Sequence, residues 1–356
     1  MIEIEELTPF TETVDADELL NEIEQYISAH AILPEGASTA IALWCIATYS
    51  INSFRIFPKL TITSPEKRCG KSTVLELINA YAYKAFTTSN ASSAVIYRLI
   101  ESHQPTFIID EADTFIAGDT GAIVGIINSG HLRSSALVTR CVGDTHGVGS
   151  FSTWTPMVLA SIGTLQTTIM DRSVAIPLER KTPDQSVETN PHDIFDLQKE
   201  TREKLLKWSI DNKESIETNP IAPDDIGNAR MVDNWTPLFT LANQVSPAWF
   251  IKCQSAYVAL TTIEDEAQLS NIMLSDIREI FNTTQGNRIS SEELLSKLKE
   301  IEEHPWEEIR LSKHGIALQL KLYGIKPKGI RIGGSTPRGY ELSQFNNAFE
   351  SYLPQQ

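Results

Sequence analysis

The chain has 356 residues, of which 41% are hydrophobic and 21% are charged, a composition typical of a globular protein with two or three domains. It contains no run of about 18 apolar residues, so we expect no membrane-spanning helix, and its acidic start is unlike the basic start of a secretory signal. These features predict a cytoplasmic protein with no membrane partner. The four widely spaced cysteines favour neither a disulfide framework nor a zinc site.

Charge is distributed unevenly along the chain, and this distribution says more than the net charge of −16. Residues 1–54 contain ten Asp or Glu and no Lys or Arg, whereas residues 310–340 contain seven Lys or Arg and no acid. Clustered basic side chains are suited to neutralising phosphates. The acidic total therefore does not exclude a nucleic-acid partner for the C-terminal part of the chain.

The N-terminal half predicts helices followed by a parallel sheet. An acidic segment, residues 1–36, should form a helix that ends near His30, with Asp15 or Asp17 as its cap. An apolar, buried helix should follow over residues 38–50. From Leu60 onward, short β-prone runs alternate with helical patterns, which is typical of a parallel α/β sheet. We expect its strands over residues 60–63, 85–88, 106–110, 157–162 and 174–178.

The first of these strands leads into a loop that ends Gly-Lys-Ser and opens a helix. This order is typical of the phosphate-binding P-loop, whose backbone N–H groups surround the phosphates of ATP. Lys71 should reach the β- and γ-phosphates, and the Ser72 hydroxyl should bind Mg²⁺. Pro65 stands where the usual pattern has glycine, and the alternative is a chance Gly-Lys-Ser at the start of an ordinary helix. The predicted cofactor-binding residues are Ser64, Pro65, Glu66, Lys67, Arg68, Cys69, Gly70, Lys71, Ser72 and Thr73.

An acidic pair follows the apolar strand over residues 106–110. A nucleotide hydrolase needs one carboxylate near Mg²⁺ and another to orient and activate water. We assign Asp110 to the metal and Glu111 to the water. The alternative is that both residues begin a solvent-exposed turn, but this would not explain why a buried strand ends at them.

Two β-prone arms, residues 136–142 and 148–154, surround a tip rich in Gly and Asp and predict a hairpin. The order of P-loop, acidic strand, hairpin, polar residue and arginine resembles AAA+ ATPases of the hairpin-bearing groups, which include viral superfamily 3 and MCM-like helicases. From about residue 37 onward, the chain more closely resembles a family of P-loop ATPase domains on phages, plasmids and genomic islands, found beside primase and replication modules. Pro65 is the usual residue in that family. The motifs that carry this resemblance lie at residues 62–72, 109–115, 128–131, 140–144, 151–156 and 171–173.

The resemblance implies an AAA+ core over residues 37–180 and a helical lid over residues 181–265. Ser161 matches the sensor position, although a small polar residue at the end of a strand is common. Arg172 matches the arginine finger that reaches the γ-phosphate of a neighbouring subunit, with a surface salt bridge as the alternative. Arg230 is a candidate for the lid arginine that contacts nucleotide in cis, with helix capping or lid packing as the alternative.

The C-terminal part, residues 266–356, predicts three helices, over residues 274–281, from about 290, and over 313–323. A strand, turn and strand over residues 329–342 follow, which together predict a winged helix. Its third helix and wing carry the basic cluster, so we expect duplex DNA there, with a protein-interaction winged helix as the alternative. The predicted DNA-binding residues are Lys313, Lys321, Lys326, Lys328, Arg331 and Arg338.

These features together predict an ATP-dependent DNA motor, the replicative helicase of a mobile genetic element. Its subunits would form an oligomeric ring such as a hexamer, with Arg140 and His146 of the hairpin gripping single-stranded DNA in the channel. The hairpin could equally pack at a subunit interface. Because no primase or nuclease centre is evident, a primase or polymerase is a candidate partner. The alternative function is an ATP-gated switch or loader that recruits replication or defence partners without unwinding DNA.

Overall fold

The computed structural model describes residues 4–117, 121–142, 147–224, 228–284, 286–301, 304–307 and 309–353. The chain divides into two compact units, Met1–Leu260 and Thr261–Gln356, and the sequence had placed the corresponding boundary at residues 265 and 266. No helix in the described part of the chain combines the length and apolar character needed to cross a membrane.

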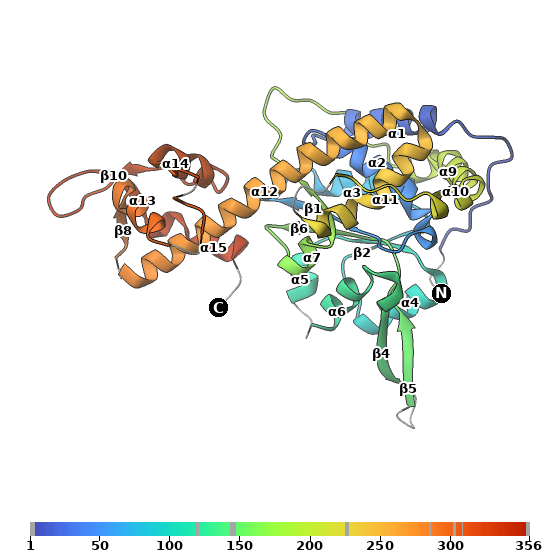
Figure 1. The fold of residues 1–356 in the computed structure, drawn as a ribbon, viewed down its shortest axis with the longest axis horizontal. Coiled ribbons are helices and arrows are strands. Elements are labelled where there is room, and N and C mark those ends of the chain that lie inside the picture. The colour runs from blue at the N-terminus through green and yellow to red at the C-terminus, as the bar shows by residue number, and fades with distance from the viewer. Residues whose placement is uncertain are drawn as a thin grey trace. The chain divides into compact units, whose positions relative to one another are not determined.

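The first unit is built on a five-stranded sheet in which every pair of neighbouring strands is parallel. The strand order is β2-β3-β6-β1-β7, so β6 lies between β1 and β3 (Figure 1). Parallel strands place all their carboxyl ends at one edge of the sheet. The prediction of a parallel α/β sheet is confirmed. The strand bounds are β1 Lys59–Ser64, β2 Ala85–Thr88, β3 Thr106–Ile109, β6 Met157–Ile162 and β7 Ser173–Pro177.

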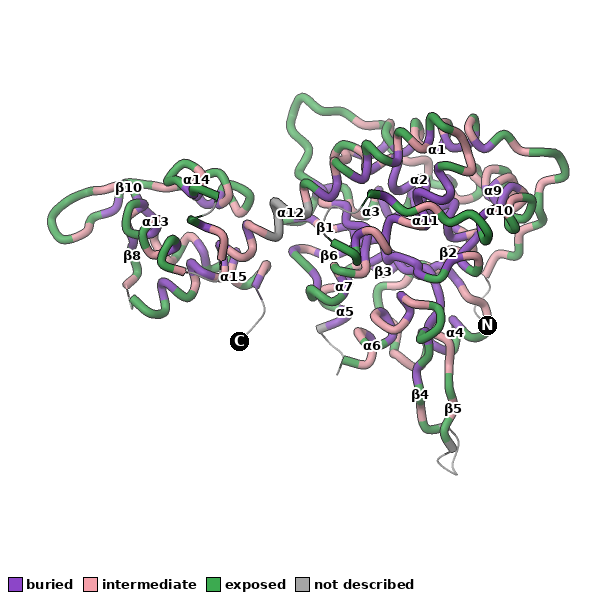
Figure 2. The backbone as a smooth tube through the Cα atoms, viewed as in Figure 1, coloured by how far each residue is buried: buried purple, intermediate pink, exposed green. Residues whose placement is uncertain are grey.

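Helices cover both faces of this sheet, which explains why β1, β3 and β6 are almost entirely buried (Figure 2). On one face, Phe107, Ile109, Met157 and Leu159 form a core with α4, α5, α6 and α7. On the other face α2 is buried at nearly every position and contacts α3 and α11. The helices bounding these two layers are α2 Ala37–Thr48, α3 Lys71–Tyr81, α4 Ser93–His103, α5 Ala112–Ala117, α6 Ala122–Ser129, α7 Thr167–Met170 and α11 Ala229–Val245.

The segments on either side of the sheet region, residues 1–36 and 181–265, pack on that region. Helix α1 (Ala16–His30) is capped by the Asp15 carboxylate, as predicted, and packs on α2. The helices expected as a lid contact α1, α2 and α3 and belong to the same unit. Their bounds are α8 Ile194–Leu197, α9 Lys199–Asp211, α10 Lys213–Thr218 and α12 Pro247–Thr284, the last of which continues into the second unit.

The predicted hairpin is confirmed and projects away from the sheet (Figure 1). Its arms are β4 (Leu137–Val142) and β5 (Gly147–Ser152), paired antiparallel with Arg140 opposite Gly149. The predicted contact residue His146 lies outside the described residues. Buried Lys59 holds the base of the hairpin together, because its ammonium donates to Gly130 O at 3.0 Å and to Thr155 O at 3.2 Å. Burial lowers the pKa of Lys59 to about 7.

The second unit combines helices with a three-stranded antiparallel sheet in the order β8-β10-β9. Its core contains Leu294, Leu298, Trp306, Tyr340 and Phe345. The sequence missed β8, and it expected the strand over residues 329–332 to be longer than β9 is. Where the sequence predicted the end of this strand, the structure has one isolated antiparallel β-bridge between Ile332 and Ser335. The elements are β8 Arg288–Ser290, α13 Ser291–Lys299, α14 Lys313–Lys321, β9 Lys328–Gly329, β10 Arg338–Glu341 and α15 Asn346–Tyr352. Short 3-10 turns lie at Ile51–Ser53, Arg133–Ser135 and Leu342–Gln344.

Candidate functional site

The carboxyl edge of the sheet brings together three of the predicted site segments. Ser64 ends β1, Ser161 lies near the end of the adjacent β6, and Asp110 directly follows β3 on the far side of β6. The N–H of Gly163 donates to Ser64 O at 2.8 Å, which joins the ends of β1 and β6. A crevice at the carboxyl ends of parallel strands is where α/β sheets bind their ligands.

The loop over residues 64–73 turns sharply before α3 begins at Lys71. Arg68 has φ 70° and Gly70 has φ 85°, so both adopt the left-handed conformation, which glycine tolerates and arginine rarely adopts. The Glu66 carbonyl accepts hydrogen bonds from Ser64 Oγ at 2.8 Å and Cys69 Sγ at 3.3 Å. These contacts hold the loop above the start of α3, where backbone N–H groups lack helical partners and favour anions.

Lys71 points across this loop toward the acidic strand. Its ammonium donates to Ser64 Oγ at 2.5 Å. Partial burial lowers the pKa of Lys71, and the nearby Cys69, Asp110 and Asp113 act in the opposite direction. The lysine cation therefore lies at the loop, within electrostatic range of Asp110. A bound phosphate would give this cation a stronger partner than the Ser64 hydroxyl.

Asp110 and Glu111 lie at the same edge in different environments. Asp110 Oδ1 accepts the N–H of Glu111 at 2.8 Å, which fixes the aspartate beside the turn. Glu111 is exposed and has φ 52°, a strained conformation for a residue with a side chain. Ser72 and Asp110 supply the hydroxyl and carboxylate that Mg²⁺ accepts when phosphates and water complete its shell, so the residues fit that metal. In the described part of the chain, no three potential metal-ligating side chains gather into a cage.

Ser161 is buried, and its hydroxyl donates to Gly163 O at 3.2 Å. It lies near the end of β6, the strand between β1 and β3. The structure thus places Ser161 where the sequence expected it, with a local hydrogen bond of the kind common at strand ends.

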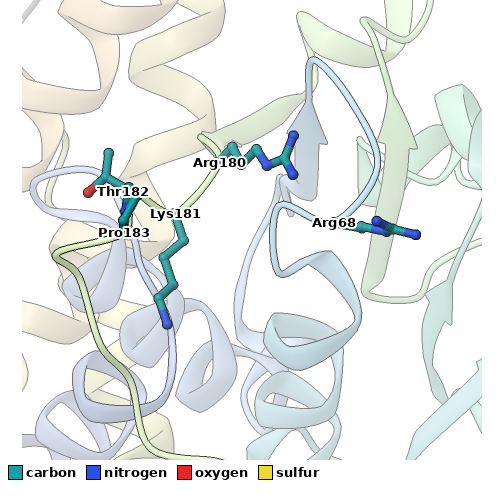
Figure 3. Close-up of a pocket in the computed structure, with 5 residues that line it drawn as sticks. All are labelled: Arg68, Arg180, Lys181, Thr182 and Pro183. Atoms are coloured by element: carbon teal, nitrogen blue, oxygen red, sulfur yellow. The ribbon is translucent and has the colours of Figure 1, made fainter.

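Sequence reasoning missed two basic side chains beside the loop, Arg180 and Lys181, and it predicted only their neighbour Arg68. An open pocket of about 600 Å³ is lined by Arg68, Arg180, Lys181, Thr182 and Pro183 (Figure 3). Arg180 pairs with Glu66 of the loop at 3.2 Å. The signal in the sequence was the pair Arg180-Lys181 directly after the last strand, since β7 neighbours β1 and ends at the same edge.

Arg172 lies at the opposite, amino-terminal edge of the sheet. Its carbonyl accepts the N–H of Lys59 at the start of β1, and its Nη1 donates to Thr168 O at 2.6 Å. Five residue steps along β1 separate Lys59 from Ser64, which is about 16 Å of strand. Arg172 therefore lies far from the 64–73 loop of its own chain.

Arg230 lies beside Arg172 and not beside the loop, which corrects the expectation of a contact in cis. Its Nη1 lies 3.4 Å from His131 Nδ1. Burial lowers the pKa of Arg172, and the neighbouring charge of Arg230 lowers it further. Asn234, one turn further along α11, explains the position of Arg230. Its side chain bonds His131 at 2.8 Å and donates to the carbonyls of Asp171 and Ser173 at 3.1 Å each. These bonds dock the start of α11 at the amino-terminal edge.

His131 takes part in this contact as a neutral side chain. Burial lowers its pKa to about 4, and the nearby charges of Lys59, Arg230 and Arg172 act in the same direction. In the described residues no ion pair involves Arg172 or Arg230. The amino-terminal edge therefore exposes positive charge suited to an anion from outside this chain.

The predicted DNA-binding side chains of the second unit are all exposed, but some of them form ion pairs or hydrogen bonds within the chain. Lys313 lies 3.7 Å from Glu292, and Lys328 lies 2.6 Å from Glu341, whose pKa is lowered by this contact. Arg338 donates to the Pro327 carbonyl. Within the described ranges, Lys321, Lys326 and Arg331 form no ion pair. In the first unit, Arg140 is half-buried with its guanidinium 5.8 Å from the Tyr97 ring centre.

Comparison with known proteins covers only part of this arrangement. A family described as "Protein of unknown function (DUF3631)" matches residues 177–352. The match begins at the end of β7, so it includes Arg180, Arg230 and the second unit but excludes the 64–73 loop and the acidic pair. A search of curated proteins finds no match. Over residues 177–352 the chain is similar to a family to which no activity is assigned.

Proposed function

We propose that this protein is an ATP hydrolase of the AAA+ type that acts as a DNA motor, with the 64–73 loop as its P-loop. The observation that carries this proposal is the position of Lys71 at the start of α3, where its ammonium bonds Ser64 Oγ at the end of β1 and lies within electrostatic range of Asp110. A cation, helix N-terminal N–H groups and a strand-end acidic pair are the parts needed for phosphoryl transfer to water.

The strand order supports this assignment. Neighbouring strands are about 4.8 Å apart, so inserting β6 separates the ends of β1 and β3 by about 10 Å. That separation leaves room for a phosphate chain between Lys71 and Glu111, with Ser161 beneath it.

Each residue then has a separate task in hydrolysis. Lys71 and the N–H groups at the start of α3 would hold the phosphates. Ser72 and Asp110 would hold Mg²⁺, which would offset the negative charge of the phosphates. Glu111 orients the attacking water and accepts its proton, for which its exposed carboxylate at the edge is suited. The Ser161 hydroxyl would donate a hydrogen bond to the reacting phosphate.

Arg172 supports an oligomeric arrangement. Because it lies at the edge opposite the P-loop, it can approach a nucleotide only if that nucleotide is bound by another subunit. Repeating a contact between opposite edges generates a ring when the rotation between subunits closes, and a hexamer fits the motor function. Arg230 accompanies Arg172 at this edge and belongs to the same subunit interface.

For the DNA contacts, we assign the projecting β4–β5 hairpin to single-stranded DNA and the second unit, as a winged helix, to duplex DNA. Three exposed and unpaired cations on α14 and the wing support the second assignment.

The experiment that tests the motor is ATP hydrolysis with and without single-stranded DNA, together with strand displacement on forked DNA. Stimulation with displacement supports a helicase, whereas stimulation without displacement favours the loader or switch. An absence of stimulation would contradict a DNA motor.

Reversing the charge of two unpaired cations, Lys321→Glu with Arg331→Glu, should weaken duplex DNA binding about tenfold or more. The plot of log K against log salt concentration should also become less steep, by about 2 units of slope, because each lost phosphate contact removes about one unit. Fluorescence anisotropy at several salt concentrations measures both quantities. The matched control, Lys204→Glu with Lys213→Glu, changes the net charge equally but in the first unit. If both pairs weaken binding equally, the effect is one of total charge and the assigned surface is wrong.

A further inference from the structure

We infer that Arg180 binds the phosphate chain of the nucleotide in cis, and that Glu66 competes with the nucleotide for its guanidinium. The inference rests on the proposed function and adds a residue and a control element to its site. It also supplies the cis arginine that Arg230, at the opposite edge, does not provide.

Arg180 is held at the P-loop by the sheet. The N–H of Leu178, just after β7, donates to Thr63 O at 2.7 Å, which keeps the end of β7 beside the end of β1. Further along the same segment, the Asn190 amide donates to Thr73 O at 3.3 Å and to Glu76 at 3.0 Å on α3. The segment after β7 is therefore fastened on both sides of the P-loop, with Arg180 close to its start.

The direction of the side chains separates Arg180 from its basic neighbours. In Figure 3 the Arg180 guanidinium extends toward the P-loop, whereas Lys181 extends away from it and Arg68 points to the far side of the loop. These three residues line one open pocket of about 600 Å³ beside the loop. An entering phosphate chain would find Arg180 already directed at its binding loop.

The pair between Arg180 and Glu66 is suited to exchange. The two side chains are 59% and 52% exposed, and ion pairs at such exposure contribute little because water screens them. Phosphate accepts the planar guanidinium through two parallel hydrogen bonds, which is a stronger contact than an exposed carboxylate offers. Glu66 therefore holds Arg180 while the site lacks nucleotide, and a phosphate chain can displace it at little cost.

The test is the dissociation constant for Mg²⁺ and a fluorescent N-methylanthraniloyl derivative of ATP, measured by anisotropy on the full chain. Arg180→Ala should weaken binding about five- to tenfold, because a charge-assisted hydrogen bond is lost. Glu66→Gln should tighten binding about threefold, because the competitor of the phosphate is removed. The loop should keep its shape, since Ser64 and Cys69 bond the backbone carbonyl of residue 66 and not its side chain.

The double variant separates a specific exchange from general electrostatics. In the Arg180→Ala background, Glu66→Gln should no longer tighten binding, because no guanidinium remains to be released. An equal gain in both backgrounds would overturn the inference, as would weaker binding by Glu66→Gln alone. Lys213→Ala and Glu217→Gln, which change an exposed pair 4.0 Å apart on α10, are the matched controls and should leave affinity unchanged.

Lys71→Ala distinguishes failure of this inference from failure of the proposed function. If Lys71→Ala abolishes binding while Arg180→Ala binds normally, the P-loop assignment stands and the role of Arg180 is refuted. If the unaltered protein does not bind the nucleotide, both proposals are refuted. Partial recovery of affinity in Arg180→Lys would support a contact through charge.

Discussion

Glu111→Gln should lower the turnover of ATP about 10³-fold while leaving the affinity for ATP within about threefold. The amide has nearly the same shape as the carboxylate but cannot accept a proton from water. The backbone N–H of residue 111 would still donate to Asp110 Oδ1, so the magnesium ligand should keep its position. Phosphate release measures turnover, and anisotropy with the fluorescent nucleotide measures affinity.

Asp113→Asn is the control for this prediction. Asp113 is a second acid near Lys71, on the first turn of α5, and lies outside the proposed water-activating pair. Its substitution should reduce turnover by less than about tenfold. Normal turnover in Glu111→Gln would show that another group activates the water, and loss of nucleotide binding would show that Glu111 acts in binding.

Arg172→Ala should reduce ATP turnover by about 10³-fold or more, because the charge that develops on the transferred phosphate loses a cation from the neighbouring subunit. Mixing this variant with Lys71→Ala should restore part of the activity. In an equal mixture of subunits in a ring, about one quarter of the interfaces combine an intact P-loop with an intact Arg172 from its neighbour. Turnover measured after subunit exchange tests this.

A second mixture provides the control. Lys71→Ala and Glu111→Gln both damage the half of the site that one subunit supplies, so mixing them should restore no activity. Recovery in the first mixture and not in the second supports a shared site. If Arg172→Ala retains normal turnover, or if mixing it with Lys71→Ala restores nothing, the shared site is refuted.

The sheet and the residues at its carboxyl edge could be predicted because their signals are local. Residues 106–109 are β-branched or aromatic and almost all apolar, which favours a strand buried on both faces, and Asp110 follows directly. The glycine before Lys71 likewise marks a left-handed turn into a helix, and Gly70 has φ 85°. In each case a few neighbouring residues determine both the conformation and the edge of the sheet at which the side chains lie.

The positions of Arg230 and Arg180 could not be predicted from neighbouring residues. Arg230 reaches the amino-terminal edge because Asn234 bonds backbone carbonyls at residues 171 and 173, about sixty positions earlier in the chain. Arg180 reaches the 64–73 loop because β7 pairs with β1, which lies more than a hundred positions earlier. Strand β8 was missed for a similar reason, since three residues become a strand only by pairing with β10. Such contacts depend on tertiary packing, which local periodicity does not encode.

The most direct test of a P-loop ATPase is hydrolysis of Mg²⁺-ATP by the unaltered protein and by Lys71→Ala, with circular dichroism to show that both are folded. Lys71 is half-buried and its ammonium donates a hydrogen bond to Ser64 Oγ. Removing this side chain removes the cation that the phosphates need. We expect hydrolysis by the unaltered protein, increased by single-stranded DNA, and a loss of at least about 100-fold in the variant. Equal hydrolysis by the two proteins, or none by the unaltered protein with DNA present, would contradict the account.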